Sequence, residues 1–366
     1  MAALQGCSRP PSSESQGLPV VRVVTVTARD TPVAFEFVAQ IESSQQVDIH
    51  SRVNGFLIQR AYTEGALVRR GDVLFRIDPK PLRVQLDQAL AVLQKNQAVL
   101  SNAQANFNRV RPLVQQHALS QKELDDATGT QQSAAAAVAQ SEAQVDQARL
   151  NLSYATITSP INGITGAATQ ADGTYISEQN SLLTTVAALS PMWVNFSMSE
   201  NQFQTLREEV RRGELRVPPG QNYTVQVEFV DGSIFPYTGN VTFLDPYYNP
   251  NTGTFLVRAS VQNPAGVLRP YQFVRARVAG AVRPNAILVP QRAVQQGSEG
   301  AFVWVVEQDQ TVDERPVMVG DWHGDAWFIT QGLRSGEQVV VDGVQRLAPK
   351  MHVTLAPAAQ AEHAGP

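Results

Sequence analysis

The sequence has a single cysteine, Cys7, among 366 residues, which excludes an internal disulfide. Charged residues make up only 17% of the chain, and the net charge of −4 gives no reason to expect a nucleic-acid-binding surface. No run approaches the ~18 consecutive apolar residues of a membrane-spanning helix. The five histidines lack metal-ligand spacing, and no P-loop or G-x-S-x-G motif occurs. We therefore expect a protein of two or more domains that is not an enzyme and carries no cofactor or metal.

One short motif is written twice, at a constant offset of 108 positions (159 − 51). The first copy is "SRVNGFLIQRAYTEGALVRRGDVLF" from Ser51, and the second is "SPINGITGAATQADGTYISEQNSLL" from Ser159. In each copy an Asn-Gly pair is followed ten residues later by an acidic residue and glycine, which favours tight hairpin turns. The four turn glycines are Gly55, Gly65, Gly163 and Gly173. Each copy is too small to bury its own apolar face, so the pair is predicted to close one sandwich.

A helical segment of different character separates the copies. Asp78 is suited to be an N-cap and Pro79 to be the first helical residue, and the helix is expected to run to about residue 115. Its heptad positions carry Leu86, Ala89, Leu93, Leu100, Ala103, Phe107, Val110 and Val114. Apolar residues at this spacing predict the seam of a coiled coil.

A second helix is predicted after "QQHAL", because Ser120 and Glu123 form a capping-box pattern. Its heptad positions carry Leu124, Ala127, Gln131, Ala134, Val138, Ser141, Val145, Ala148 and Leu152. Two arms of about 35 residues with a short connection predict an antiparallel coiled-coil hairpin that reaches ~50 Å.

The remainder of the chain reads mainly as β-strand. Residues 19–46 and 286–355 contain strand-like runs, and residues 222–280 contain short strands at the spacing of a small barrel. A helix is expected from Ser199, which forms a capping box with Gln202. The predicted fold class is mainly β with a long helical hairpin, in an elongated chain of several domains.

The N-terminal stretch "LQGC" resembles the end of a bacterial lipoprotein signal, in which Cys7 would carry the lipid. The preceding "MAA" is too short for the apolar region of a signal peptide, so either a leader is trimmed here or the match is chance. The following "SRPPSSESQG" reads as a flexible tether. The C-terminal "APAAQAEHAGP" is expected to be disordered.

Each motif copy resembles half of a biotinyl or lipoyl barrel sandwich. In the carrier enzymes a modified lysine sits on the turn between the halves, and here the helical hairpin replaces that turn. Lys80 lies nearby, in "DPKPL", without the flanking residues of a carrier site. A biotin or lipoyl carrier, with the prosthetic group on Lys80, is thus one alternative function. The other interpretation of Lys80 is an exposed lysine in the first turn of a helix.

The order of parts resembles that of the periplasmic adaptors, or membrane-fusion proteins, of tripartite efflux pumps driven by RND transporters. The phrases "ATITSPINGITG", "NPAGVLRPYQFVRARV" and "GLRSGEQVVVDGVQRLAP" also look familial. The resemblance implies the following domains: a lipoprotein-like N-terminus and tether at 1–18, a membrane-proximal β domain at 19–46 plus 283–356, a lipoyl-like sandwich at 47–78 plus 156–189, a coiled-coil hairpin at 79–155, a β-barrel at 190–282, and a disordered tail at 357–366.

The resemblance also implies partners. They are an inner-membrane RND transporter, a TolC-like outer-membrane channel, further copies in a six-membered ring, and the inner membrane through a lipid on Cys7. Channel contact is expected at the hairpin tip from Arg109, Leu113 and Ser120, which match the family's spacing. Pro112 within that motif is expected to kink or end the first arm early. An adaptor of an ABC-type exporter shares this architecture and remains an alternative.

Other features depart from the family pattern or invite a different site. The family's Pro-Gly turns appear here as Pro270-Tyr271 and Pro349-Lys350, so these turns are expected to differ in conformation. The acidic and histidine residues of "GDWHGDAW" suggest a metal or catalytic site, but a β-turn between strands fits better. A group of arginines suggests an anion site, although three nearby glutamates favour a solvated helix face. These arginines are Arg207, Arg211, Arg212 and Arg216.

Overall fold

The computed structural model describes residues 18–298 and 300–356, without the side chain of Gln221. Cys7, its predicted tether and the predicted tail at 357–366 lie outside these residues. The chain divides into two compact units. One comprises residues up to Ala39, Phe196–Ala259 and the chain from Arg275 onward, and the other comprises Gln40–Asn195 and Ser260–Val274.

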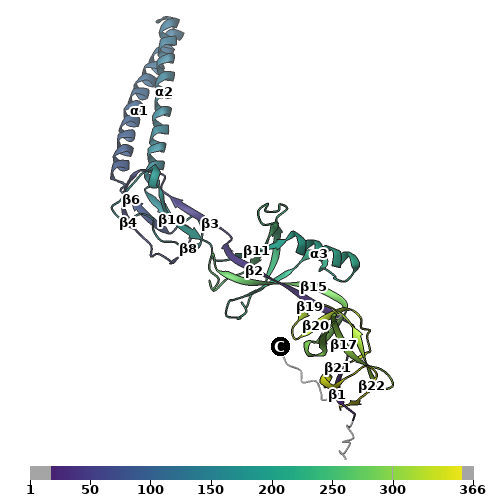
Figure 1. Cartoon of the computed structure of the whole chain (residues 1–366). Coiled ribbons are helices and arrows are strands. Elements are labelled where there is room, and N and C mark those ends of the chain that lie inside the picture. Colours follow the sequence, from purple (N-terminus) through teal and green to yellow (C-terminus); the bar gives the residue numbers. More distant parts are fainter. Residues whose placement is uncertain (1–17, 299, 357–366) are drawn as a thin grey trace, which may run out of the picture. The chain divides into compact units, whose positions relative to one another are not determined.

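The second unit contains a sandwich built from both motif copies (Figure 1). Its strands are β3 (Gln46–His50), β4 (Gly55–Arg60), β5 (Leu67–Val68), β6 (Val73–Ile77), β7 (Thr156–Thr158), β8 (Gly163–Thr165), β9 (Tyr175–Ile176) and β10 (Leu182–Ala187), with a 3₁₀ turn η1 (Glu178–Asn180). They form two sheets, in the orders β3-β10-β8-β5 and β7-β6-β4-β9. Side chains of both copies share one core, including Leu57, Leu74, Ile176 and Leu183. The prediction of a shared sandwich is confirmed.

The two copies are related by an internal two-fold symmetry in their strand pairing. β4 pairs with β9 through Gly55 and Ile176, and β8 pairs with β5 through Gly163 and Val68, the positions related by the offset of 108. The acidic residues repeat the relation. Asp172 Oδ1 accepts the amide of Arg60 at 2.9 Å, and Glu64 Oε1 accepts the amide of residue 168 at 2.7 Å. Each half therefore completes the other.

The turn glycines differ from one another in role. Gly65 and Gly173 occupy tight turns at φ 74° and 89°, as the acidic-Gly pairs predicted. The hairpin prediction for the Asn-Gly pairs is wrong. Gly55 begins β4 and Gly163 begins β8, and each of these strands lies in a different sheet from the strand that precedes it in the chain. A Cβ on Gly163 would meet the Ala187 carbonyl oxygen at 2.3 Å, so close approach of the backbone explains that glycine.

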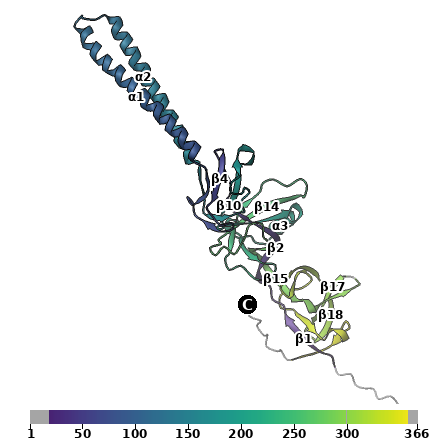
Figure 2. The ribbon, with the colours of Figure 1, turned by 90° about the vertical axis from the view of Figure 1, so that its left-hand side faces the viewer.

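The helical hairpin is inserted between two neighbouring strands of the sandwich. β6 and β7 are antiparallel partners through Val73 and Thr158, and the amide of Ile77 donates to the carbonyl of Ala155 at 2.8 Å. Helix α1 (Lys80–Gln115) leaves from the end of β6, and helix α2 (Gln121–Ser153) returns to β7 (Figures 1 and 2). The helices therefore occupy the place of a β-turn.

The predicted heptads form the contact between the two helices. Ala103 on α1 is buried, as are six of the nine predicted seam residues on α2. Two polar layers interrupt the seam. Asn96 Nδ2 lies 3.3 Å from the carbonyl of Ala137 and 3.4 Å from Ser141 Oγ, and Gln131 Nε2 donates to Gln104 Oε1 at 2.6 Å. Such polar pairs fix the axial register of a coiled coil.

The ends of the helices differ in detail from expectation. α1 begins one residue later than predicted, at Lys80, whose amide donates to Asp78 Oδ1 at 3.0 Å. The expectation that Pro112 ends the first arm early is wrong, because α1 continues to Gln115. Pro112 leaves only three further helical residues, so the helix loses little by its missing amide.

A closed barrel lies next in the chain. Its strands are β2 (Arg29–Ser43), β11 (Met192–Ser199), β12 (Thr224–Glu228), β13 (Gly239–Leu244), β14 (Thr254–Val261) and β15 (Phe273–Pro290). Their order is β12-β13-β14-β11-β2-β15, and pairing of β12 with β15 closes the ring. Helix α3 (Glu200–Arg212) follows the confirmed Ser199–Gln202 capping box and ends at Gly213 in the left-handed conformation, and η2 (Pro219–Gln221) comes before β12. β2 thus hydrogen bonds within the barrel sheet, although the sequence placed residues 29–43 in the membrane-proximal domain.

The terminal β domain combines the N-terminal strand with the C-terminal strands. Its elements are β1 (Val20–Thr25), η3 (Gln291–Ala293), β16 (Val294–Gly297), β17 (Gly300–Val306), β18 (Thr311–Pro316), β19 (Met318–His323), β20 (Ala326–Gln331), β21 (Gln338–Asp342), η4 (Val344–Arg346), β22 (Met351–His352) and β23 (Thr354–Leu355). β1 lies between β21 and β23, which makes the domain discontinuous in sequence as predicted.

The two turns that lack the family's glycine keep a left-handed residue. Tyr271 has φ 66° and Lys350 has φ 64°. The expectation of a different turn conformation at these positions is wrong, because the flanking strands hold the turns. The amide of Tyr271 donates to Ile41 and that of Lys350 to Val312, each at 2.7 Å.

Candidate functional site

The hairpin tip is a short turn between the two helices. After α1 the amide of Ala118 donates to the carbonyl of Leu113 at 2.8 Å, and the amide of His117 donates to that of Val114 at 2.9 Å. This is a Schellman arrangement, in which His117 takes the left-handed position at φ 58° where glycine is usual. The tip backbone is thus closed on itself, and its side chains point outward from a defined scaffold.

Arg109 and Leu113 lie one helical turn apart on the same face of α1. Both are exposed, and Leu113 leaves 36% of its surface in solvent. Among the described residues no carboxylate lies within ion-pair distance of the Arg109 guanidinium. The tip therefore presents an uncompensated cation beside an exposed apolar side chain.

Ser120 has a structural task at the same tip. Its amide and its hydroxyl donate to Glu123 Oε2 at 2.8 Å and 2.9 Å, which completes the predicted capping box. These hydrogen bonds, the amide first, hold the pKa of the Glu123 carboxyl below its ordinary value. The single hydroxyl proton of Ser120 is already donated, so toward a partner its oxygen is available only as an acceptor.

Sequence reasoning did not single out Arg111, which is also exposed and without an ion pair in the described part of the chain. The signal was present in "RVRPL", where two arginines stand two positions apart. Residues two apart on a helix face different directions. Arg109 and Arg111 therefore offer the same charge on different faces of the tip.

The other sequence candidates have ordinary structural surroundings. Lys80 is exposed in the first turn of α1. The "GDWHGDAW" segment forms the hairpin between β19 and β20, with Gly324 at φ 62°, as its β-turn interpretation predicted. Asp321 of that hairpin binds Arg283 at 2.8 Å. Within the described residues, no group of three or more His, Cys, Asp or Glu side chains is placed to hold a metal ion.

A sandwich interrupted by a coiled coil, followed by a closed barrel and a discontinuous β domain, defines the class of membrane-fusion adaptors. Family models of the RND membrane fusion proteins match three segments: the barrel-sandwich hybrid domain at residues 45–187, the β-barrel domain at 191–282 and the C-terminal permuted SH3 domain at 285–346. The chain belongs to the RND membrane fusion protein family. Members of this family are non-enzymatic adaptors of efflux pumps.

Relatives are similar over nearly their whole length. The multidrug efflux pump subunit AcrA of Escherichia coli (strain K12) is 35% identical over 354 residues, which cover 96% of this chain and 89% of AcrA. The efflux pump periplasmic linker BepD of Brucella suis biovar 1 (strain 1330) is 35% identical over 350 residues, which cover 95% of this chain and 88% of BepD.

A solved structure is similar in fold. MacA from Actinobacillus actinomycetemcomitans superimposes with a TM-score of 0.60 at 24% identity, covering 87% of this chain and 98% of MacA. Across residues 18–298 and 300–356, no helix combines the length and the apolar character needed to cross a membrane.

Proposed function

We propose that this chain links an inner-membrane, proton-driven RND transporter to a TolC-like outer-membrane channel as a periplasmic adaptor. The observation that carries the proposal is the insertion of two long helices between β6 and β7, where a carrier domain has a short turn. The insertion directs a charged and apolar tip away from the sandwich core. The similarity to AcrA, a multidrug efflux pump subunit, supports the same role.

The barrel and the membrane-proximal β domain dock on the transporter, and several copies pack side by side as a six-membered ring that seals the export conduit. Exposed valines along α1 support lateral packing of hairpins. They are Val84, Val92 and Val99. The domain boundaries of this proposal are those predicted from the sequence, with β2 completing the barrel.

Deleting the hairpin tests the adaptor function directly. Because Ile77 and Ala155 are already hydrogen bonded, residues 78–154 can be replaced by an Asn-Gly turn that leaves the sandwich strands in register. We expect this variant to fold, with strand circular dichroism retained, and to give no drug resistance in a strain that has it as sole adaptor. Wild-type resistance from the folded variant would refute the proposal.

Charge reversal at the tip tests the channel contact. Arg109→Asp is expected to weaken capture of the channel in pull-down, while Arg111→Asp, the same change on another face, is the matched control. Ser120→Asp keeps the helix cap, since aspartate caps as well as serine, but adds charge at the contact. Capture that is equal for Arg109→Asp and Arg111→Asp would show that the tip assignment is wrong.

The transporter class is tested by crosslinking in cells. A photo-crosslinker at an exposed barrel position, Tyr247, is expected to trap an RND transporter. Trapping an ABC-type exporter instead would move the chain to the alternative adaptor class. A biotinyl or lipoyl mass on Lys80 in the intact protein would overturn the adaptor proposal altogether.

The membrane anchor is a separate proposal, because Cys7 lies outside the described residues. A lipid on Cys7 would tether the adaptor to the inner membrane on the periplasmic side. We expect Cys7→Ser to move the protein from the membrane fraction to the soluble periplasmic fraction. A mature protein without a diacylglyceryl mass would exclude the anchor and leave the adaptor function intact.

A further inference from the structure

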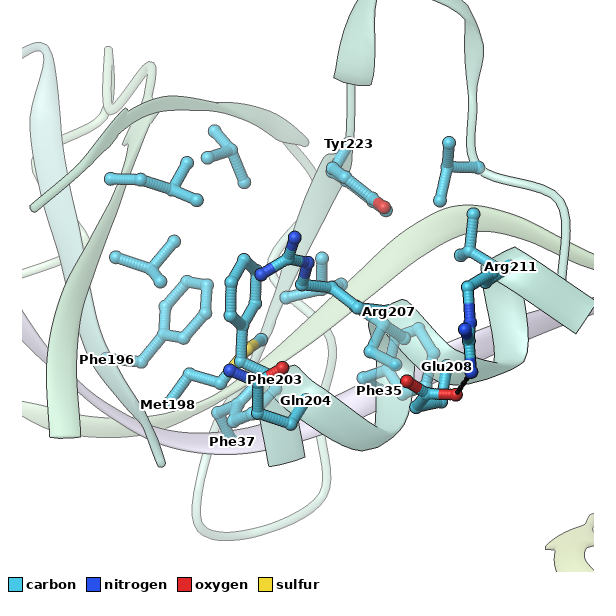
Figure 3. A pocket seen from close by; sticks show the side chains of 17 residues that line it. Phe35, Phe37, Phe196, Met198, Phe203, Gln204, Arg207, Glu208, Arg211 and Tyr223 are labelled. Carbon is cyan, nitrogen blue, oxygen red and sulfur yellow. Dashed lines mark hydrogen bonds and ion pairs between the residues drawn. The ribbon is translucent and has the colours of Figure 1, made fainter. Parts of the chain in front are cut away.

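A cavity of about 640 Å³ lies between helix α3 and strands of the barrel (Figure 3). All of its lining residues belong to the same compact unit. They come from α3, from the chain that follows it and from barrel strands β2, β11, β13, β14 and β15. The volume falls within the ~300–1,000 Å³ of sites that hold small molecules.

The walls of the cavity are mostly aromatic and aliphatic. Phe37 and Phe196 stack with ring centroids 4.9 Å apart, and Phe203 meets the cavity from α3. Phe35 and Phe37 stand two residues apart on β2, so both point to the inner face of the barrel. Met198 adds a flexible thioether to the same wall (Figure 3). These walls suit a flat apolar body.

One cation faces this apolar space without a counter-ion. The Arg207 guanidinium extends over the cavity, 5.8 Å from the centroid of the Phe203 ring (Figure 3). In the part of the chain that the structure describes, no carboxylate lies within ion-pair distance of it. Glu208 at the rim is already bound to Arg211 at 2.6 Å.

The other arginines of the sequence cluster differ from Arg207. Arg212 pairs with Glu214 at 3.7 Å and Arg216 with Asp30 at 3.4 Å. The interpretation of the cluster as a solvated helix face holds for all four arginines, which are exposed. Arg207 differs only in having no ion-pair partner among the described residues. The pattern of alternating charges could not reveal this, because pairing depends on which way each side chain points.

A neutral hydrogen-bonding group completes the cavity. The Tyr223 ring lines it, and partial burial raises the pKa of the Tyr223 phenol, which keeps the hydroxyl protonated. No hydrogen bond to another described residue engages that hydroxyl. Arg207 and Tyr223 are thus two polar groups at the edge of an aromatic chamber, one of them positively charged.

We propose that this cavity binds an amphipathic anion, with its flat apolar body between the phenylalanines and its carboxylate or sulfonate on Arg207. The arginine fork matches the geometry of such an anion, and the aromatic walls cover the apolar body of the ligand. The ligand class is a small aryl carboxylate or sulfonate. The site is independent of the proposed adaptor function and is tested without any pump partner.

Two probes with one aromatic body separate charge from hydrophobicity. Protein carrying ¹³C-methyl methionine is titrated with 2-naphthalenesulfonate and, separately, with 2-naphthylmethylammonium. We expect the sulfonate to shift the Met198 methyl signal saturably and the ammonium to do so at least tenfold more weakly. Met318 and Met351 lie in the terminal β domain and serve as internal controls. Equal affinity for both probes, or no Met198 shift, would overturn the proposal.

Variants on one helix assign the charge. Arg207→Gln is expected to weaken sulfonate binding about tenfold or more, the effect of losing one charge-assisted hydrogen bond. Arg212→Gln removes an equal charge from the same helix away from the cavity lining and should leave the affinity unchanged. Equal weakening by the two variants would mean that only net charge matters. That result would contradict the proposed site. In a further variant, Val241→Trp, the larger side chain fills the cavity, and retained sulfonate binding by this variant would also contradict the site.

Discussion

Lys350 occupies the left-handed region at the entrance to β22 and is exposed, without a side-chain contact that would favour its conformation. The left-handed conformation costs a residue with a Cβ about 1–2 kcal/mol. Glycine avoids this strain, but it gives the unfolded chain more conformational entropy, which offsets part of the gain. We predict that Lys350→Gly raises the free energy of unfolding by about 0.5–1 kcal/mol, measured by urea denaturation. Lys350→Ala, with the same loss of the side chain, should give no such gain.

Arg283 is a nearly buried cation that joins α3 to the β19–β20 hairpin. It bonds Glu209 at 3.2 Å and Asp321 at 2.8 Å, with 12% of its side chain exposed. Burial nevertheless raises the pKa of the Glu209 carboxyl, because desolvation outweighs the attraction of Arg283. The native state therefore keeps the Glu209 proton to higher pH than the unfolded chain does.

This raised pKa predicts a pH dependence of stability. Between the ordinary pKa of about 4.5 and the raised pKa of Glu209, the native state binds more protons than the unfolded chain does. The contribution of Glu209 to the free energy of unfolding therefore falls as the pH rises through this interval. Glu209→Gln keeps the shape but does not titrate, so its free energy of unfolding should fall less over that interval than that of the wild type. Urea unfolding followed by tryptophan fluorescence from pH 4 to 7 measures this, and parallel profiles would contradict it.

At the scale of elements, the coiled coil contains one avoidable weakness. Gly129 lies inside α2, and a Cβ there would meet no atom within 4 Å. We predict that Gly129→Ala stabilises the hairpin by about 1 kcal/mol, the difference in helix propensity. The reverse change at an exposed position of the same helix, Ala136→Gly, should cost a similar amount. Thermal melting at 222 nm compares the two.

The two sandwich halves depend on their exchanged acidic hydrogen bonds. Asp172→Ala and Glu64→Ala each leave a backbone amide of the other half without its acceptor, and we predict a cost of about 1 kcal/mol apiece. Glu178→Ala removes an exposed acid of the same domain that makes no such bond and serves as the control. Equal stability of all three variants would show that the halves are joined by their core alone.

Elements differed in how well the sequence predicted them. The helices were predictable because heptads and capping boxes are local patterns, and α2 begins where Ser120 and Glu123 indicated. The Asn-Gly pairs misled because the turn type alone does not say which strand pairs with which. At Gly55 and Gly163 the partner strands come from the other motif copy, 121 residues (176 − 55) and 95 residues (163 − 68) away.

At the scale of the whole molecule, the division of the chain into two compact units predicts two unfolding transitions. Helices α1 and α2 lie in the unit that includes residues 40–195, whereas three of the four tryptophans lie in the other unit. We predict that urea curves followed by circular dichroism at 222 nm and by fluorescence do not coincide. Trp193→Phe should separate them further by leaving fluorescence from one unit alone. Coincident curves would mean that the units unfold together.

The sequence by itself determined the duplicated half-motif, the coiled-coil hairpin, the order of the domains and the family, because these are written in periodic or contiguous residues. Tertiary structure decided which strands pair and that β2 completes the barrel. It also decided that Arg207 lines an aromatic cavity without a counter-ion, whereas the other arginines of the cluster pair with carboxylates. The physical reason is that pairing, burial and counter-ions are properties of residues far apart in the chain. Their meeting depends on side-chain directions that no local pattern specifies.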